Sequence, residues 1–274
     1  MTYENPSTVD ILLPIKKDSR FLEEAVNSLI KQTYTNWVLV AIIDFDDLLS
    51  EKFLLKTIQK EQLIIVKQHR FVNLSRTLNV GLQHCKNNLT ARMDADDICH
   101  PNRLKKQVDL FSHVDNKTLV LCGSQANIID QNNNPVGSIK VPTSHKRIVR
   151  RLLLRNSFVH PSVMFRTEVV RELQYDENVL IAQDYELWLR CAMKNKVINL
   201  DEKLISYRLH GDNQSLERLP FSDFSRIWVS RKNLALKYNF PLLLSLIFHL
   251  IFILRYYLFP PLVRKKTFIT KNIK

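Results

Sequence analysis

The sequence predicts an α/β protein built on a mainly parallel sheet. In its first half, short apolar runs alternate with amphipathic runs of helical period, and the run at residues 9–15 is apolar at nearly every position. A strand that is apolar on both sides is typical of a parallel sheet covered by helices on both faces. Regular alternation of strands and helices is the pattern that builds such a sheet.

The elements expected in this half follow in order along the chain. Strands are expected at residues 9–15, 38–43, 62–67 and 89–93. Helices are expected at residues 22–29, 51–60, 74–85 and from Pro101 onward. Asp18 or Ser19 is a suitable cap for the first helix, and proline suits the first turn of the last.

Beyond Thr118 the pattern becomes mixed. Strands are expected at residues 119–129, 158–166, 197–200 and 204–209, and helices at residues 146–155 and 184–193. We therefore expect a first domain over residues 1–219 whose second half contains antiparallel as well as parallel strands. A boundary is expected near Pro220, where acidic residues nearly stop.

The tail over residues 220–274 is basic and hydrophobic and is expected to be helical. Of the net charge of +13, ten positive charges lie from Phe224 onward, with no Asp or Glu among them. They flank the apolar run 242–254, which is short of the about 18 to 20 residues that cross a bilayer. A helix in the plane of an anionic membrane surface is favoured, with a core or oligomer helix and a membrane span as alternatives. Nucleic acid is not an expected partner.

The positions of the glycines and cysteines indicate how a phosphate can be bound and in which redox compartment the protein works. The four glycines are too far apart for a phosphate-binding glycine loop, so another group, such as a metal ion, must hold any phosphate. The four cysteines form no Cys-x-x-Cys pair, which fits a reducing compartment. The N-terminus has no secretory signal pattern. We expect a cytoplasmic protein, peripheral at the inner face of the cell membrane.

Acidic residues follow two of the expected strands. Asp44 follows one strand, and the sequence Asp-Ala-Asp-Asp at residues 94–97 follows another. In an open α/β sheet, ligands bind beyond the carboxyl ends of the strands. Asp94 and Asp96 would project to the same side, and their repulsion calls for a divalent cation such as Mn²⁺ or Mg²⁺ beside a diphosphate. An acidic turn that caps the following helix is the structural alternative.

Several motifs in a fixed order carry a resemblance to a known family. They read ILLPIKKDSRFLEEAVNSLIKQTYTNW, VLVAIID, LSRTLNVGLQHCKNNLTARMDADDICHPNRL, FVHPSVMFR, AQDYELWLR and YRLHGDNQS. Over about residues 9–215 the chain resembles the bacterial family-2 glycosyltransferases, which have the Rossmann-like GT-A fold. The resemblance implies metal-dependent, inverting transfer of a sugar from a nucleotide diphosphate to a glycan or lipid-linked acceptor, in the biosynthesis of surface polysaccharide.

The resemblance also implies roles for residues that bind the donor and the metal. Asp44 matches the residue that accepts a hydrogen bond from the imide of uracil or thymine, which implies a UDP- or dTDP-sugar. Asp94 matches the contact to the ribose, and Asp96 matches the metal ligand, a role that Asp97 could share. Departures from the family occur at Lys16, in place of a frequent tyrosine, and at Ile43, in place of a frequent acid.

Arg76 and Asn79 lie in a segment that precedes the acidic motif, and they match residues of the family that lie over the nucleotide. A pair on the surface of a helix, one exposed and one capping, is the structural alternative. His210 matches a histidine that approaches the metal or the diphosphate, with a hydrogen-bonded structural histidine as its alternative.

The expected general base is Asp184, which matches an acidic residue beside the acceptor. Gln183 stands where the family usually has a second acid, and a helix N-cap is the alternative role of Asp184. His160 matches a position beside the acceptor, where we expect a satisfied core histidine. One carboxylate suffices to deprotonate an acceptor hydroxyl in a direct displacement.

Two other functions stay open at this point. The sequence at residues 94–98 nearly fits the nucleophile motif of haloacid-dehalogenase phosphohydrolases, although that motif usually follows the first strand. A non-catalytic, membrane-bound scaffold with a degenerate transferase fold is the other alternative, because fold alone does not establish activity.

Overall fold

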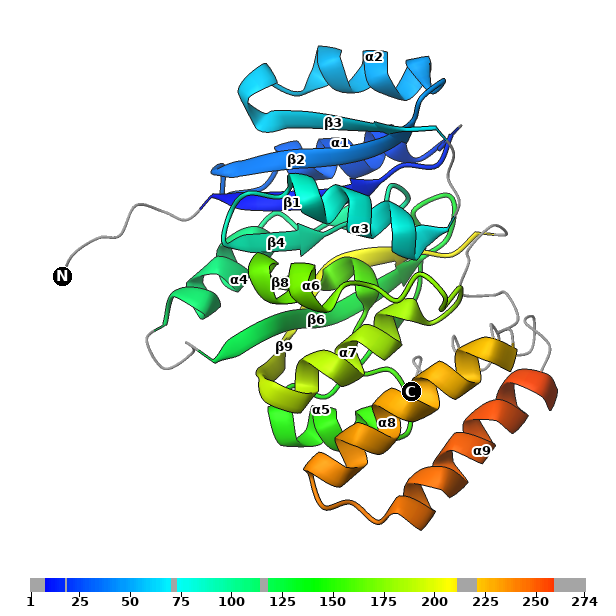
Figure 1. Cartoon of the computed structure of the whole chain (residues 1–274). Helices are drawn as coiled ribbons and strands as arrows, with labels where there is room; N and C mark the ends of the chain where they lie inside the picture. Colours follow the sequence, from blue (N-terminus) through cyan, green and yellow to red (C-terminus); the bar gives the residue numbers. More distant parts are fainter. Residues whose placement is uncertain (1–7, 18, 70–72, 114–117, 211–220, 259–274) are drawn as a thin grey trace.

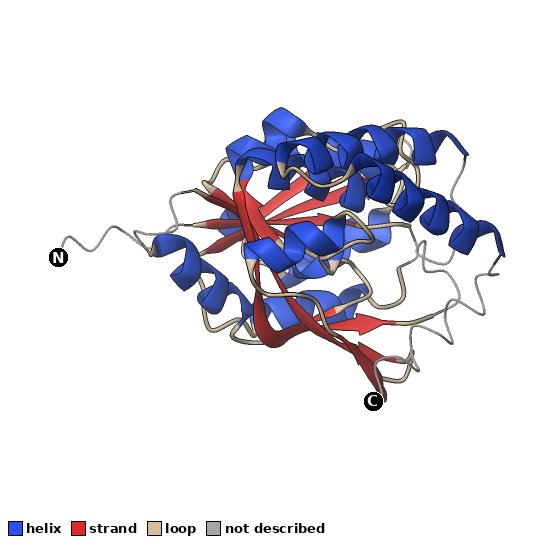
Figure 2. Cartoon of the chain, turned by 90° about the horizontal axis from the view of Figure 1, so that it is seen from below, coloured by secondary structure: helices blue, strands red, loops and turns tan. Residues whose placement is uncertain are grey.

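The sheet is covered by helices on both faces (Figure 1, Figure 2). The structure is a computed structural model that describes residues 8–17, 19–69, 73–113, 118–210 and 221–258. In that part of the chain, nine strands form one sheet, in the order β3-β2-β1-β4-β8-β6-β9-β5, with β7 paired to β6. The mainly parallel α/β architecture expected from the sequence is confirmed, with its mixed second half.

The bounds of the elements are as follows. The strands are β1 Val9–Pro14, β2 Trp37–Asp44, β3 Leu63–Gln68, β4 Leu89–Arg92, β5 Ile98–Cys99, β6 Leu119–Ile129, β7 Pro135–Ile139, β8 Met164–Arg166 and β9 Lys196–Arg208. The helices are α1 Leu22–Ile30, α2 Leu48–Thr57, α3 Leu74–His84, α4 Arg103–Ser112, α5 His145–Leu152, α6 Thr167–Leu173, α7 Gln183–Lys194, α8 Phe221–Lys237 and α9 Leu242–Leu258.

Burial on both faces explains why the first strands are apolar. Along β1, Leu12 belongs to a core cluster that includes α3, α5 and α7, whereas Ile11 and Leu13 belong to a cluster that includes α1 and α4. Successive side chains of a strand point to opposite faces, so both faces of β1 need apolar residues. The strands β3, β2, β1 and β4 pair in parallel, and β8 is antiparallel to β4 and β6.

Capping residues set where the helices start. The helix expected from residue 51 begins at Leu48, because Asp47 accepts a hydrogen bond from the Ser50 N–H at 3.1 Å. The expected cap of α1 by Ser19 is wrong, since its N-cap is Phe21 and no side chain caps it. Asp18, the other expected cap, lies outside the described residues.

Other differences from the expected elements lie in the second half. The strand expected at 158–166 is replaced by a 3-10 turn, His160–Ser162, and only its last three residues form a strand, β8. Pro161 lies in this turn, and proline cannot donate a hydrogen bond to a sheet. The two strands expected at 197–209 form the single strand β9, in which register shifts accommodate the polar middle segment.

The helical tail begins with two antiparallel helices. Ile227, Leu234 and Ala235 of α8 are buried in the same core cluster as Trp188 of α7. The face of α9 that points away from α8 is exposed and apolar. Among the described residues, no helix combines the length and the apolar character needed to cross a membrane. The expected boundary at Pro220 lies outside those residues.

Candidate active site

The acidic residues expected at the strand ends lie at one edge of the sheet. Asp44 is the last residue of β2, and Asp94 follows β4 by two residues. Leu12 of β1 pairs with Val40 on one side and with Arg92 on the other, so the three strands are in register. Asp44 and Asp94 therefore extend beyond the same end of the sheet, separated by one strand.

Three carboxylates gather directly after β4. One oxygen from each of Asp94, Asp96 and Asp97 lies within 4.8 Å of the others. Asp97 is 1% exposed, and its Oδ1 accepts a hydrogen bond from the Arg208 N–H at 2.8 Å. Burial, and then the negative charges of Asp96 and Asp94, raise the pKa of Asp97 well above its usual range.

This cluster fits a hard divalent cation. The Oδ2 atom of Asp97 is buried and has no hydrogen-bond partner within the described residues. The negative charge of three neighbouring carboxylates is thus only partly compensated, and carboxylate oxygens are the ligands that Mg²⁺ and Mn²⁺ prefer. The donor set and the uncompensated charge fit a divalent metal ion at this place, and the identity of the ion stays a prediction.

Residues at and directly after the end of β9 contact the acidic loop over residues 94–97. The Nε2 atom of His210 lies 2.7 Å from Oδ2 of Asp96, and a role of this histidine as a metal ligand stays a prediction. The buried guanidinium of Arg208 donates from Nε to the carbonyl oxygen of Asp96 at 2.7 Å and from Nη2 to Glu24 at 3.0 Å. The loop is therefore fixed through both its backbone and its side chains.

The expected base lies in the first turn of α7. The Nδ2 atom of Asn156 donates to Oδ2 of Asp184 at 2.7 Å, and its Oδ1 accepts from the Phe158 N–H at 3.0 Å. Burial raises the pKa of Asp184, against the lowering effects of the Tyr185 N–H, Asn156 and a nearby arginine. The N-cap of α7 is Ala182, so the alternative role of Asp184 as N-cap is wrong.

That arginine, Arg92, connects the two acidic parts of the site. It is 1% exposed and forms an ion pair with Asp94. Its charge also lowers the pKa of Asp184, so it lies close enough to act on both carboxylates. We did not expect this role from the sequence. The signal is an arginine at the end of an apolar strand, two residues before Asp94, where side chains share one side.

The two expected nucleotide contacts on α3 lie in different surroundings. Arg76 is exposed, whereas Asn79 is 6% exposed. The side chain of Asn79 donates to the Tyr175 carbonyl at 2.8 Å and accepts from the Tyr175 N–H at 2.9 Å. Asn79 thus fastens the segment that leads to α7, and a contact of either residue with the donor stays a prediction.

His160 has the structural surroundings expected of it. Its Nε2 lies 3.0 Å from the hydroxyl oxygen of Tyr175, and its ring centroid lies 5.9 Å from that of Trp188. Burial, with a smaller effect of Arg92, lowers its pKa well below the usual range, so the ring is neutral at pH 7.

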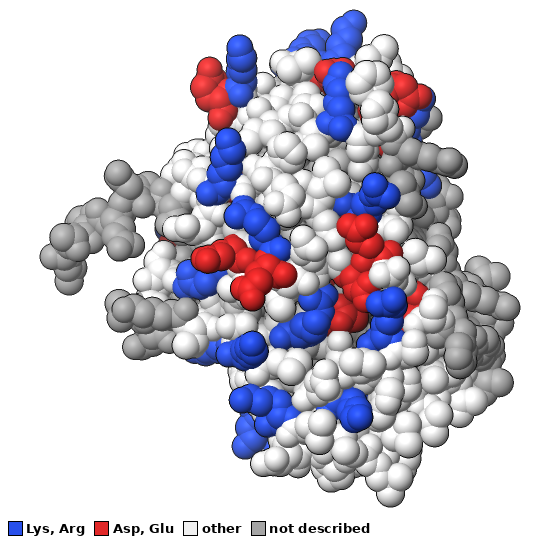
Figure 3. All heavy atoms as spheres, in the orientation of Figure 1, with Lys and Arg blue, Asp and Glu red and all other residues white. Residues whose placement is uncertain are grey.

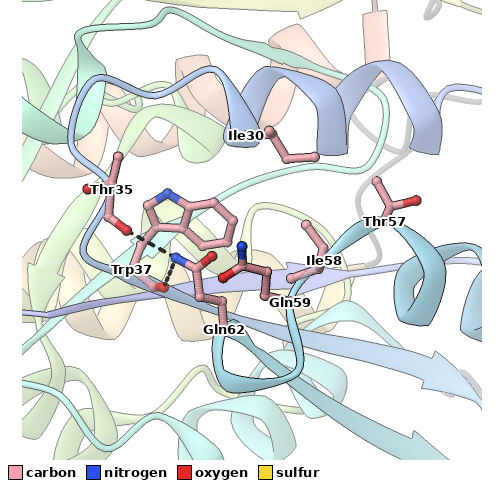
Figure 4. Close-up of a pocket in the computed structure, with 7 residues that line it drawn as sticks. All are labelled: Ile30, Thr35, Trp37, Thr57, Ile58, Gln59 and Gln62. Atoms are coloured by element: carbon pink, nitrogen blue, oxygen red, sulfur yellow. Dashed lines mark hydrogen bonds between the residues drawn. The ribbon is translucent and has the colours of Figure 1, made fainter.

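A hollow of about 160 Å³ lies at the other end of β2 (Figure 4). It is lined by Ile30, Thr35, Trp37, Thr57, Ile58, Gln59 and Gln62. Since Trp37 begins β2 and Asp44 ends it, the hollow is roughly 23 Å from the acidic edge. None of its lining side chains is titratable, and it is not part of the site.

Comparison with known proteins identifies the class and then the family. The fold is similar to that of Staphylococcus aureus TarS 1–349 in complex with UDP-GlcNAc, with a TM-score of 0.68 and 15% identity over 92% of this chain and 73% of that chain. This likeness shows that the chain has the GT-A fold. The profile of glycosyl transferase family 2 matches residues 10–174, and the chain belongs to this family.

Two curated relatives have more specific names. The chain is 32% identical over 238 residues to the amylovoran biosynthesis glycosyltransferase AmsE of Erwinia amylovora, covering 84% of this chain and 86% of the relative. It is 26% identical over 245 residues to the O-antigen biosynthesis glycosyltransferase WbnJ of Escherichia coli, covering 88% and 94%. The chain is thus a glycosyltransferase enzyme, and neither the phosphohydrolase nor the scaffold alternative is supported.

Proposed function

We propose that this chain is a metal-dependent, inverting glycosyltransferase that moves a sugar from a UDP- or dTDP-sugar to a hydroxyl of a glycan or lipid-linked acceptor. The observation that carries the proposal is the approach of three acidic groups, Asp44, the cluster at Asp94 and Asp184, to one edge of the sheet. The names of the relatives, which concern O-antigen and amylovoran, support a role in surface polysaccharide biosynthesis.

Asp44 binds the base of the donor in this proposal. Its Oδ1 atom is buried and has no hydrogen-bond partner within the described residues. A buried carboxylate oxygen without a donor is costly, and the imide N–H of uracil or thymine would satisfy it. Asp94, held by Arg92, contacts the ribose. The UDP-GlcNAc and UDP complexes of TarS support a uridine donor.

Asp96, Asp97 and His210 would hold the divalent ion. When bound, such an ion neutralises the diphosphate and stabilises it as a leaving group. The chain itself supplies the position of these ligands, because Arg208 fixes the backbone of Asp96 and the side chain of Asp97.

Asp184 removes the proton from the acceptor hydroxyl as that oxygen attacks the anomeric carbon. Direct attack opposite the leaving group inverts the configuration and needs one base. Asn156 orients this base. Its amide is fixed by the Phe158 N–H, so the nitrogen faces Asp184 and stabilises the ionised carboxylate.

The acceptor is reached at the cytoplasmic face of the membrane. The outer side chains of α9 are apolar and exposed, among them Leu243 at 71% and Ile251 at 54%. Monomeric soluble proteins rarely expose a contiguous apolar patch of this kind without a partner. An apolar face with flanking cations suits peripheral attachment to an anionic bilayer, where lipid-linked acceptors lie.

A panel of nucleotide sugars tests the proposal. We expect UDP- or dTDP-sugars to raise the melting temperature in the presence of Mn²⁺, and to raise it less in the presence of chelator, because ligands that bind only the folded state stabilise it. The stabilising donors are then supplied in labelled form with membrane lipid extract. Transfer of label to lipid or glycan supports the proposal. Stabilisation by purine donors alone, or release of phosphate without transfer, contradicts it.

A further inference from the structure

The exposed face of α5 carries an unbalanced positive charge. We propose that this face is a docking surface for anionic phospholipid headgroups and acts together with the apolar face of α9. The inference rests on the proposed function as a membrane-associated transferase, and it assigns a membrane contact to the first domain in addition to the tail.

The cations of α5 have no acidic partners in the part of the chain that the structure describes. No Asp or Glu lies between Asp130 and Glu168 in the sequence. Lys146, Arg147 and Arg150 of α5 are exposed, and none of them forms an ion pair within the described residues. Some other lysines of this chain pair with acids, whereas the exposed Lys52, Lys56 and Lys60 near α2 have no ion pair within the described residues. Lys105 pairs with Asp109, Lys106 with Glu202 and Lys67 with Glu51.

A partly buried arginine of the same helix, Arg151, also lacks an acidic partner within the described residues. Burial, and then the charge of Arg155, lower the pKa of Arg151 to about 10. Its Nη1 donates to the carbonyl of Lys140 at 3.1 Å, and its Nε is buried with no hydrogen-bond partner within the described residues. Anionic headgroups would compensate the positive charges of Arg151 and Arg155.

The orientation of α5 is fixed by its apolar side. Ile148, Val149 and Leu152 are buried in the core cluster, which leaves the cations on the solvent side. At the start of this helix, Nε2 of His145 lies 2.8 Å from the hydroxyl oxygen of Tyr238, which follows α8 and precedes α9. The basic helix thus directly contacts the hairpin that carries the apolar face.

The figures show these elements at one end of the molecule. In Figure 1, α5, α8 and α9 lie at the end opposite α2. In Figure 3 the lower surface over α8 and α9 is largely free of charged side chains, with Lys and Arg along its border. Apolar side chains that insert and cations that remain among headgroups are what binding to an anionic bilayer requires. A soluble anion would not need the apolar part.

The chain that follows α5 contacts the expected base, Asp184. Arg155, which is exposed, directly precedes Asn156, and Asn156 donates the 2.7 Å hydrogen bond to Asp184. In this proposal, docking through α5 brings the acceptor side of the site to the bilayer surface. A hydroxyl of a lipid-linked acceptor, which projects from that surface, comes within reach.

Charge reversal in the full chain tests the inference. The test variant is K146E/R147E/R150E on α5. The matched control is K52E/K56E/K60E on and directly after α2, whose three lysines are also exposed and lie at the opposite end. Each variant lowers the net charge by six. Binding is measured by flotation with phosphatidylcholine vesicles with and without phosphatidylglycerol, and UDP binding is measured by calorimetry.

We expect the α5 variant to lose about 100-fold in affinity for the anionic vesicles, from about fivefold for each cation, while the control changes a few-fold. Equal affinity of the α5 variant and the unmodified chain, or equal loss in the control, overturns the inference. If the reversal variant does not fold, K146Q/R147Q/R150Q gives the same test. UDP binding is independent of these outcomes, and its absence in the unmodified chain would instead count against the proposed donor site.

Discussion

At the scale of single residues, Asp184 carries the proton transfer. We expect Asp184→Asn to bind UDP normally and to lower kcat by about 10² to 10⁴-fold, since an amide cannot accept the acceptor proton. Calorimetry and a turnover assay with the donor from the panel measure the two effects. Asp201→Asn, on the exposed middle of β9, is the control. Unchanged turnover of the Asp184 variant would remove this residue from the mechanism.

Asn156 sets the pH range in which the base works. Activity is lost as the pH falls through the pKa of Asp184, because only the ionised carboxylate accepts a proton. The hydrogen bond from Asn156 lowers that pKa. We therefore expect Asn156→Ala to move the acidic limb of kcat/KM to higher pH, by about one unit for the loss of one hydrogen bond to a charged group.

The exposed Asn132→Ala is the matched control for this profile. A purely structural effect of Asn156→Ala would lower the rate equally at every pH. An acidic limb that stays in place would show that this hydrogen bond does not tune the base.

The sequence predicts the positions of some of these residues but not the contacts of others. The positions of Asp44 and Asp94 at one edge of the sheet could be predicted, because each lies at the end of an apolar run and the carboxyl ends of parallel strands share one edge. Arg92 and Asn156 could not, since their roles depend on which side chains meet across the sheet and across a loop. Asn79 lies in the expected segment, but its amide is engaged with the backbone of Tyr175.

At the scale of elements, α8 supports the start of α7. The Oδ2 atom of Asp223 accepts hydrogen bonds from the N–H groups of Leu180 and Ile181, at 3.0 and 2.9 Å, directly before α7. Arg231 donates to the hydroxyl of Tyr185 at 2.7 Å, next to the base. The first helix of the tail is thus closely packed against the helix that carries Asp184.

Removing the carboxylate of Asp223 tests this support. We expect Asp223→Ala to lower the free energy of unfolding by about 2 to 4 kcal/mol, because two backbone N–H groups lose a charged acceptor in a buried place. Urea unfolding measures the change, with the exposed Ser225→Ala as control. A loss no larger than that of the control would show that α8 does not hold this segment.

Helices and strands differ in how far the sequence predicts them. The repeat of Leu22, Ala25, Val26 and Leu29 places α1 correctly because one face of this helix is buried. The short strand β5 and the edge strand β7 were not expected. The strand β5 is held by pairing with the distant β9, and β7 by pairing with β6, which directly precedes it in the chain; neither is held by a local apolar pattern.

At the scale of the whole molecule, the apolar face of α9 should hold the enzyme on membranes. Deletion of residues 240–274 would also remove His249, which lies 3.1 Å from Arg231. We therefore choose the outer residues and expect L243Q/L250Q/L254Q to reduce flotation with anionic vesicles by about 10-fold or more, since insertion of apolar area is lost.

L48Q/L49Q/L55Q on α2 is the matched control, because these leucines are also exposed and lie at the opposite end of the molecule. Flotation that is the same in both variants and in the unmodified chain would contradict attachment through α9.

The overall fold could be predicted because its signals are local and repeated. Each strand of the first half is apolar on both faces, and each helix between them has one apolar face. The surroundings of α9 could not be predicted in this way. The run 242–254 is apolar almost all round, so its pattern does not state which side packs on α8 and which side is exposed.

Calorimetric titration of UDP, with and without Mn²⁺, tests the central claim most directly. The unmodified chain should bind UDP more tightly when Mn²⁺ is present, and Asp96→Ala should lose this enhancement, by at least about 10-fold, while it remains folded. Equal binding of UDP by both proteins with Mn²⁺, or binding that does not depend on the ion, would contradict a nucleotide-diphosphate site built on these carboxylates.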